Sequence, residues 1–137
     1  MDAKLIKQYG DELYHAMQSK QAVAPLTARE SDISIEDAYH ISLQMLNRRI
    51  DAGAKVIGKK IGVTSKAVQS MLNVHQPDFG YLTDDMVFNQ GEVMPISERL
   101  IAPKAEGEIA FILKKDLMGP GISNADVLAA TECVIPC

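Results

Sequence analysis

The hydrophobic and polar positions follow a helical period in the first part of the chain. Between residues 2 and 19, apolar side chains recur about every four residues, which predicts an amphipathic helix. A second helix is predicted after Ser34, because Ser34 and Asp37 form a typical capping box and Gly53 is a typical C-terminal stop. Arg49, near the end of this helix, complements the helix dipole without any ligand.

Further along, the pattern changes to that of short strands, turns and two shorter helices. Residues 55–63 are rich in β-branched side chains and predict a strand, which is followed by a short helix capped by Thr64 or Ser65. The segment 73–80 is rich in turn formers and predicts a loop. A helix at 125–131, capped by Ser123 or Asn124, and several strands complete the pattern, the strands being expected at 81–82, 86–88, 91–94, 104–114 and 133–137.

Lys60 lies in the first predicted strand between two glycines. The two-residue period of a strand places Gly58, Lys60 and Gly62 on one face, so a ligand or another backbone can approach the ammonium group closely. A lysine in such a place can take part in acid/base chemistry. The alternative is that Lys59 and Lys60 are solvated edge residues that discourage strand association.

The alternation in residues 104–114 places Glu106 and Glu108 on one face of a predicted strand and apolar side chains on the other. Two carboxylates at this spacing can converge on one point and would repel each other without a cation or a shared proton. Gly107 favours a close approach at this point. A hard divalent metal is one interpretation, and a solvated strand face is the other.

Composition limits the function further. A chain of 137 residues with 47% hydrophobic content is expected to form one domain, and its net charge of −4 argues against nucleic acid and anionic membranes as partners. The N-terminal residues do not resemble a signal peptide and no apolar run is long enough to span a membrane, so we expect a cytoplasmic protein. Cys133 and Cys137 are expected to be free thiols.

Three segments together carry a resemblance to a known family. They are Gly58–Ser65, Gln76–Leu82 and Pro103–Ala110. In order and spacing these segments resemble the 2-oxopent-4-enoate hydratases (2-hydroxypentadienoate or vinylpyruvate hydratases) of the fumarylacetoacetate hydrolase superfamily, which act in the meta-cleavage pathway of aromatic catabolism. The resemblance covers the N-terminal part of that family, and the apolar end of the chain suggests a fragment of a longer protein.

The resemblance implies a fold and a site. The fold would be α+β, with N-terminal helices in residues 1–54 and, in residues 55–137, the first part of a mixed, curved β-structure of the superfamily's catalytic-domain type, incomplete in this chain. Glu106 and Glu108 would bind Mg²⁺ or Mn²⁺, with a third acidic ligand beyond Cys137. The protein would be a homo-oligomer that can associate with the sister decarboxylase.

The same resemblance implies a hydro-lyase. Its substrate would be 2-hydroxypenta-2,4-dienoate, bound to the metal through the C1 carboxylate and the C2 oxygen. Lys60 would move the proton between the C2 oxygen and carbon, and Asp78 would deprotonate the water that adds to C4, giving 4-hydroxy-2-oxopentanoate.

Three alternatives stay open. The first is the sister 4-oxalocrotonate decarboxylase, which shares the lysine and the acidic pair but has an apolar residue in place of Asp78. The second is a carbon–carbon bond hydrolase, for which His75 would be the water-activating histidine. The third is a non-catalytic piece that serves only in subunit association, favoured by its apolar terminal strand.

Overall fold

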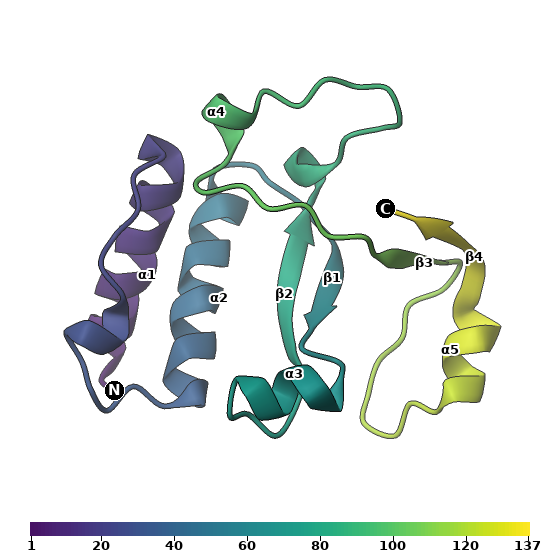
Figure 1. Ribbon diagram of the computed structural model, residues 1–137, viewed down its shortest axis with the longest axis horizontal. Coiled ribbons are helices and arrows are strands. Elements are labelled where there is room, and N and C mark those ends of the chain that lie inside the picture. The colour runs from purple at the N-terminus through teal and green to yellow at the C-terminus, as the bar shows by residue number, and fades with distance from the viewer. The chain divides into compact units, whose positions relative to one another are not determined.

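The computed structural model describes all residues from 1 to 137, and their contacts divide the chain into two compact units. The first unit comprises Met1–Ile101 and the second Ala102–Cys137 (Figure 1). Each unit contains one antiparallel pair of strands together with helices. The fold class is therefore α+β, as the sequence predicts.

Two long helices begin the first unit. Helix α1 spans Ala3–Ser19 and helix α2 spans Ile35–Asp51, with a short 3-10 helix at Leu26–Ala28 between them. The predicted capping box at the start of α2 is confirmed, because the Ser34 hydroxyl accepts from the backbone N–H of Asp37 and the Asp37 carboxylate accepts from the backbone N–H of Ser34.

The core of the first unit lies between these two helices. Tyr9 of α1 and Ile41 and Leu46 of α2 are buried there. Gly10 allows the close approach, since a side chain at this position would collide with Gln44 of α2. The amphipathic pattern that predicts both helices thus also predicts the surface through which they pack.

A β-hairpin follows the two helices. Strand β1 spans Val56–Gly62, strand β2 spans Asp78–Thr83, and helix α3 (Lys66–Met71) lies between them in the chain. The predicted strand and the predicted short helix are confirmed. The prediction of a loop up to residue 80 is wrong at its end, because residues 78–80 pair with β1. The turn-forming residues of this segment favour a loop when only neighbours in the chain are considered. The extended conformation of residues 78–80 depends on hydrogen bonding to β1, which the local pattern does not contain.

The chain after β2 has less regular structure than predicted. Asp84–Met86 forms a 3-10 helix and helix α4 spans Ile96–Arg99. The strands predicted at 86–88 and 91–94 are absent. Here a turn replaces strand pairing, because both the backbone and the side-chain N–H groups of Asn89 donate to the Glu92 carboxylate.

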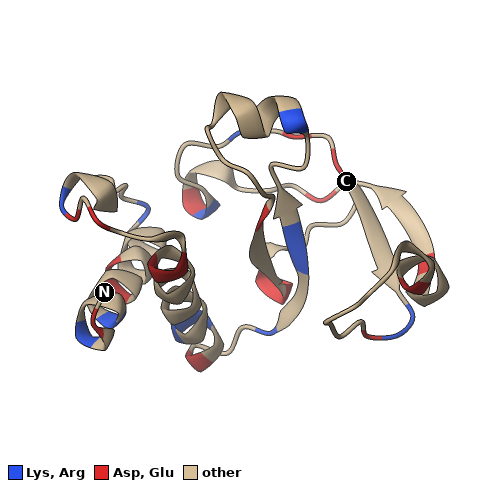
Figure 2. Ribbon diagram, turned by 90° about the horizontal axis from the view of Figure 1, so that it is seen from below, with Lys and Arg blue, Asp and Glu red and all other residues tan.

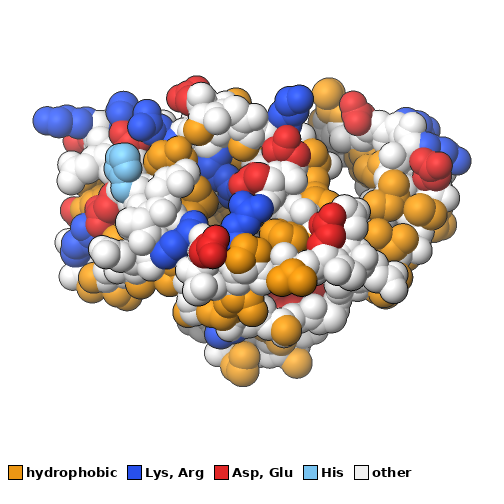
Figure 3. All heavy atoms as spheres, turned by 90° about the horizontal axis from the view of Figure 1, so that it is seen from above, with side chains coloured by type: hydrophobic (Ala, Val, Ile, Leu, Met, Phe, Trp, Pro, Cys, Tyr) orange, Lys and Arg blue, Asp and Glu red, His pale blue; other side chains and the backbone are white.

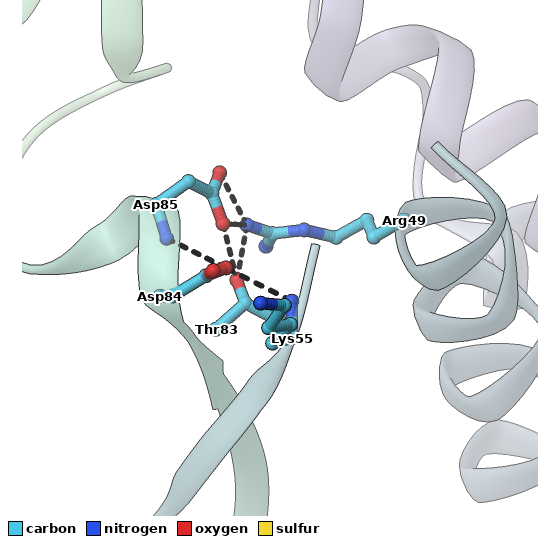
Figure 4. Close-up of polar contacts among 5 residues, drawn as sticks. All are labelled: Arg49, Lys55, Thr83, Asp84 and Asp85. Carbon is cyan, nitrogen blue, oxygen red and sulfur yellow. Dashed lines mark hydrogen bonds and ion pairs between the residues drawn. The ribbon is translucent and has the colours of Figure 1, made fainter. Parts of the chain in front are cut away.

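Arg49 joins the end of α2 to the end of the hairpin (Figure 4). Its guanidinium is buried, and Nη2 donates to the hydroxyl of Thr83 and to both carboxylate oxygens of Asp85, at 2.7 and 2.8 Å. Thr83 itself is fully buried and donates to Asp85. The hydrogen bond from Thr83 and the charge of Arg49 lower the pKa of Asp85.

The second unit consists of a strand, a helix and a second strand. Strand β3 spans Ile109–Leu113, helix α5 spans Asn124–Ala130 and strand β4 spans Thr131–Pro136. β3 and β4 pair antiparallel. The predicted helix cap is confirmed, with Ser123 as the N-cap. The strand predicted from residue 104 is wrong in its first part, because the assigned strand begins only at Ile109.

Many apolar side chains of the structure are exposed. In the second unit Ala130 is the one buried residue, and the strands β3 and β4 expose Ile109, Phe111, Ile112 and Val134. Figure 3 shows apolar side chains at the surface among charged ones, and Figure 2 shows that basic and acidic residues are interspersed along the chain.

Both cysteines are free, as predicted, and exposed. No helix combines the length and apolar character that crossing a membrane requires.

Replacement of Arg49 by Met should lower the free energy of unfolding by about 2 kcal/mol, the value typical of hydrogen bonds to a charged group. Urea denaturation measures this loss. Arg29→Met is the matched control, since the ion pair of Arg29 with Glu12 is half-exposed and should contribute only about 0.5 kcal/mol. Equal losses in the two variants would show that the buried contacts of Arg49 stabilise the fold no more than a half-exposed ion pair does.

Candidate active site

The register of the hairpin brings two of the predicted site residues onto one face. Lys60 pairs with Gly80, and Gly62 pairs with Asp78. Residues directly opposite each other in an antiparallel pair share a face, as do residues two apart in one strand. Lys60 and Asp78 are therefore diagonal neighbours on one face, and the residue opposite each of them is a glycine. Both side chains are exposed.

Gly62 provides the space in which the Asp78 carboxylate lies. A side chain built at Gly62 would collide with Oδ1 of Asp78. The sequence predicts that something approaches this glycine closely, and the structure identifies it as the carboxylate on the neighbouring strand. Gly80, which lies opposite Lys60, has open space around it instead.

The other face of the hairpin is aromatic. Phe79 stacks on Tyr39 of α2, with ring centroids 4.9 Å apart, and lies edge to face with Tyr81 at 5.8 Å. The Lys59 ammonium lies 5.2 Å from the ring centre of Phe79 and 5.3 Å from that of Tyr81. The two neighbouring lysines thus have different surroundings, since only Lys60 shares a face with Asp78.

A cavity of about 350 Å³ adjoins this aromatic face. It lies between the first half of α2, the segment after α3 and the start of β2, and most of its lining is apolar, from Ile35, Ala38, Tyr39, Val63, Leu72, Val74, Pro77 and Phe79. Asp78 contributes to the lining as well. The candidate catalytic carboxylate therefore stands at the edge of an apolar space.

Glu106 and Glu108 lie in the second unit at the start of its hairpin, and both are exposed. Glu108 exchanges two backbone hydrogen bonds with Cys137, at 2.9 and 3.0 Å, which extends the pairing of β3 and β4 by one residue. Glu106 lies before this pairing. The prediction of a regular strand through both carboxylates is therefore wrong at Glu106, because the assigned strand begins only at Ile109.

The donor set of these two residues fits a hard divalent cation in its chemistry. Two carboxylates two residues apart supply oxygen ligands, of which such a cation takes about six, several of them from water or substrate. No group of three or more His, Cys, Asp or Glu side chains in the structure could hold a metal ion. Glu106 and Glu108 would thus form part of a ligand set.

Sequence reasoning missed Gln69 of α3. Its side chain is buried, with 3% of its surface exposed, and Nε2 donates to the backbone carbonyl of Val63 at 2.9 Å. Val63 has a φ of 55°, a conformation that a β-branched residue rarely adopts. No sequence pattern predicts a left-handed conformation for a valine. The available signal is a glutamine among the apolar positions of a short helix, which indicates a polar side chain that is buried and hydrogen-bonded.

His75, the candidate water-activating residue of the hydrolase alternative, is exposed in the loop before β2.

Comparison with solved structures gives the class of fold. The chain superimposes on the 4-oxalocrotonate decarboxylase from Pseudomonas putida G7, complexed with magnesium and adipate, with a TM-score of 0.92 and 29% identity, covering 99% of this chain and 51% of that one. The same decarboxylase complexed with calcium and acetate matches equally well. No protein-family model matches the chain.

Curated relatives are hydratases. The chain is 76% identical, over its whole length, to a 2-hydroxypent-2,4-dienoate hydratase of Pseudomonas putida, and 58% identical over 99% of its length to a 2-hydroxyhexa-2,4-dienoate hydratase of Comamonas testosteroni. It spans 62% and 52% of these relatives. The resemblance to the 2-oxopent-4-enoate hydratases is therefore confirmed along the entire chain.

The two glycines on the candidate catalytic face provide a matched test of its geometry. Gly62→Ala should displace the Asp78 carboxylate, because the new methyl group needs the space of Oδ1, whereas Gly80→Ala should be tolerated. Neither glycine has a positive φ, so backbone strain does not separate the two variants. The side-chain carboxylate ¹³C signal of Asp78 should move in the first variant only. A similar movement in both would contradict this arrangement.

Proposed function

We propose that this protein is a divalent-metal-dependent hydratase that adds water to 2-hydroxypenta-2,4-dienoate and gives 4-hydroxy-2-oxopentanoate. One observation supports it above the others: a carboxylate, Asp78, shares a strand face with Lys60, in a chain 76% identical to a hydratase of this substrate. An acid and a base on one rigid hairpin suit a reaction that moves protons and activates water.

Lys60 and Asp78 have separate roles in this proposal. Lys60 accepts the proton of the C2 hydroxyl and passes it to C5 as the dienol becomes the 2-oxo-3-enoate. Asp78 then orients water and takes one of its protons while the water oxygen bonds to C4, and Asp78 passes this proton to C3. Since Gly80, opposite Lys60, has open space around it, a planar substrate can lie close to the backbone there.

Glu106 and Glu108 would hold the divalent metal, as the sequence predicts. Magnesium and calcium in the solved decarboxylase complexes support a metal of this kind, and Mn²⁺ is a further candidate. When bound, such an ion supplies Lewis acidity to the C1 carboxylate and C2 oxygen of the substrate. The core would be the mixed, curved β-structure of the fumarylacetoacetate hydrolase superfamily, with the predicted division after residue 54.

The decarboxylase is the second candidate, because the solved structures that match the chain are 4-oxalocrotonate decarboxylases. A decarboxylase has to keep water away from its intermediate, whereas Asp78 is exposed and able to bind water. Release of CO₂ from 2-oxohex-3-enedioate would identify a decarboxylase. A carbon–carbon bond hydrolase would need His75, which is exposed in the loop before β2 and lies three residues before Asp78, the first residue of that strand.

Association between subunits is a further part of the proposal. The exposed apolar side chains of β3 and β4 favour a surface that is covered in a larger assembly. We expect a cytoplasmic homo-oligomer that can also associate with the sister decarboxylase. Sedimentation analysis of the purified protein measures the oligomer directly.

Asp78→Asn should slow hydration by about 10²- to 10⁴-fold, the range typical of losing a general base. The assay follows the loss of dienol absorbance with Mg²⁺ present. Divalent-metal affinity should not change, because Asp78 is not among the proposed ligands. Asp116→Asn, in the exposed turn after β3, is the control. Normal hydration by the Asp78 variant would remove this residue from the mechanism.

Glu106→Gln and Glu108→Gln should each weaken Mg²⁺ binding, measured by titration calorimetry without substrate. An amide keeps the shape of the side chain but loses the negative charge that a hard cation needs. Glu132→Gln, on the exposed surface of β4 in the same unit, should bind Mg²⁺ as the unaltered protein does. Equal affinities in all three variants would contradict a metal site at the acidic pair.

A further inference from the structure

A strained residue directly follows strand β1, next to the proposed catalytic carboxylate. Val63 directly follows Gly62, on which the Asp78 carboxylate rests, and has a φ of 55°. A β-branched side chain in the left-handed region is a genuine outlier that persists only when its surroundings hold it. The structure must therefore contain a group that fixes the backbone at this position.

The buried amide of Gln69 is that group. Its Nε2 donates to the carbonyl oxygen of Val63 at 2.9 Å, and its Oε1 accepts from the Lys66 ammonium, also at 2.9 Å. The contact with Lys66 sets the orientation of the amide, so that its N–H₂ end faces Val63. With 3% of its surface exposed, the side chain has no room to exchange this partner for bulk water.

Gln69 also holds the chain that leads into the other strand. Its backbone carbonyl accepts from the N–H of Val74 at 2.9 Å, and Val74 begins the segment that reaches Asp78. One residue of α3 therefore contacts both the end of β1 and the approach to β2. These are the two segments whose relative position determines where the Asp78 carboxylate lies above Gly62.

We propose that Gln69 is a positioning residue for Asp78. Its amide holds Val63 in the left-handed conformation, this conformation fixes Gly62, and Gly62 supports the carboxylate on the face that carries Lys60. The inference rests on the proposed hydratase function only through the role of Asp78. Gln69 itself is buried and does not touch the substrate, so it acts through the backbone of β1.

The first test compares two glutamines of the same unit. Gln69→Leu removes the amide at similar size, and Gln44→Leu, the matched control, removes a glutamine whose Nε2 donates to Asp11 between α1 and α2. We expect the kcat for 2-hydroxypentadienoate to fall about 10- to 100-fold in the first variant with an unchanged KM, as for a misplaced catalytic group. The control should keep both constants.

The second test asks whether a glycine at position 63 restores activity to the Gln69→Leu variant. Glycine adopts a positive φ without strain, so Val63→Gly should make the backbone less dependent on Gln69. The double variant Val63→Gly/Gln69→Leu should therefore recover kcat relative to Gln69→Leu alone. If Gln69 only packed α3, removal of the valine side chain would lower activity further, and that result would overturn the proposal.

A spectroscopic measurement separates this proposal from the proposed function. The carboxylate ¹³C signal of Asp78, assigned with Asp78→Asn, should move in Gln69→Leu and not in Gln44→Leu, whether or not the protein hydrates the dienol. An inactive protein whose signal moves would contradict the function and support the positioning. An active protein with equal kcat and unmoved signals in both variants would overturn the positioning alone.

A second variant covers the case in which Gln69→Leu does not fold. Gln69→Glu keeps the oxygen that accepts from Lys66 and replaces the N–H₂ that donates to Val63 by an oxygen, which cannot donate and repels the Val63 carbonyl. We expect the same fall in kcat and the same movement of the Asp78 signal. Retention of both at their original values in a folded Gln69→Glu protein would overturn the proposal.

Discussion

The interaction on which the first unit depends is the buried contact of Arg49 with Thr83 and Asp85. It fixes the end of β2 against α2, and the Tyr39–Phe79 stack fixes the beginning. Ten residues of helix span about 15 Å, and the four strand steps from Phe79 to Thr83 span about 13 Å. The two attachments therefore match in length, and α2 acts as a rigid support along which β2 is held.

This support determines which face of the hairpin carries the proposed catalytic residues. A shift of the pairing by one residue would turn Asp78 to the aromatic face and separate it from Lys60. Such a shift would also take Phe79 from Tyr39 and Thr83 from Arg49, and so leave a buried guanidinium without its partners. The register that places Asp78 above Gly62 is thus stabilised by residues that have no part in the reaction.

The sequence predicts what depends on neighbours in the chain. The capping box at Ser34, the helix cap at Ser123 and the strand around Lys60 involve residues only a few positions apart, and all are confirmed. The local pattern explains Arg49 only by the helix dipole, because its hydrogen-bond partners Thr83 and Asp85 are 34 and 36 residues away in the chain. The position of Asp78 in a strand depends likewise on β1, since turn-forming neighbours concealed it. A local pattern does not contain such distant partners.

Glu106 and Glu108 lie in a unit with much less buried apolar surface than the unit that contains Lys60. Its unit buries only Ala130, while Ile109 and Phe111 of β3 and Val134 of β4 are exposed. Strands with apolar side chains on both faces are typical of sheets covered on both sides. The exposed side chains of β3 lie directly after the acidic pair, since Glu108 exchanges backbone hydrogen bonds with Cys137 and Ile109 begins β3. If the acidic pair holds the proposed metal, its affinity should depend on whether this apolar surface is covered, because two carboxylates bind a cation tightly only when their backbone is already held.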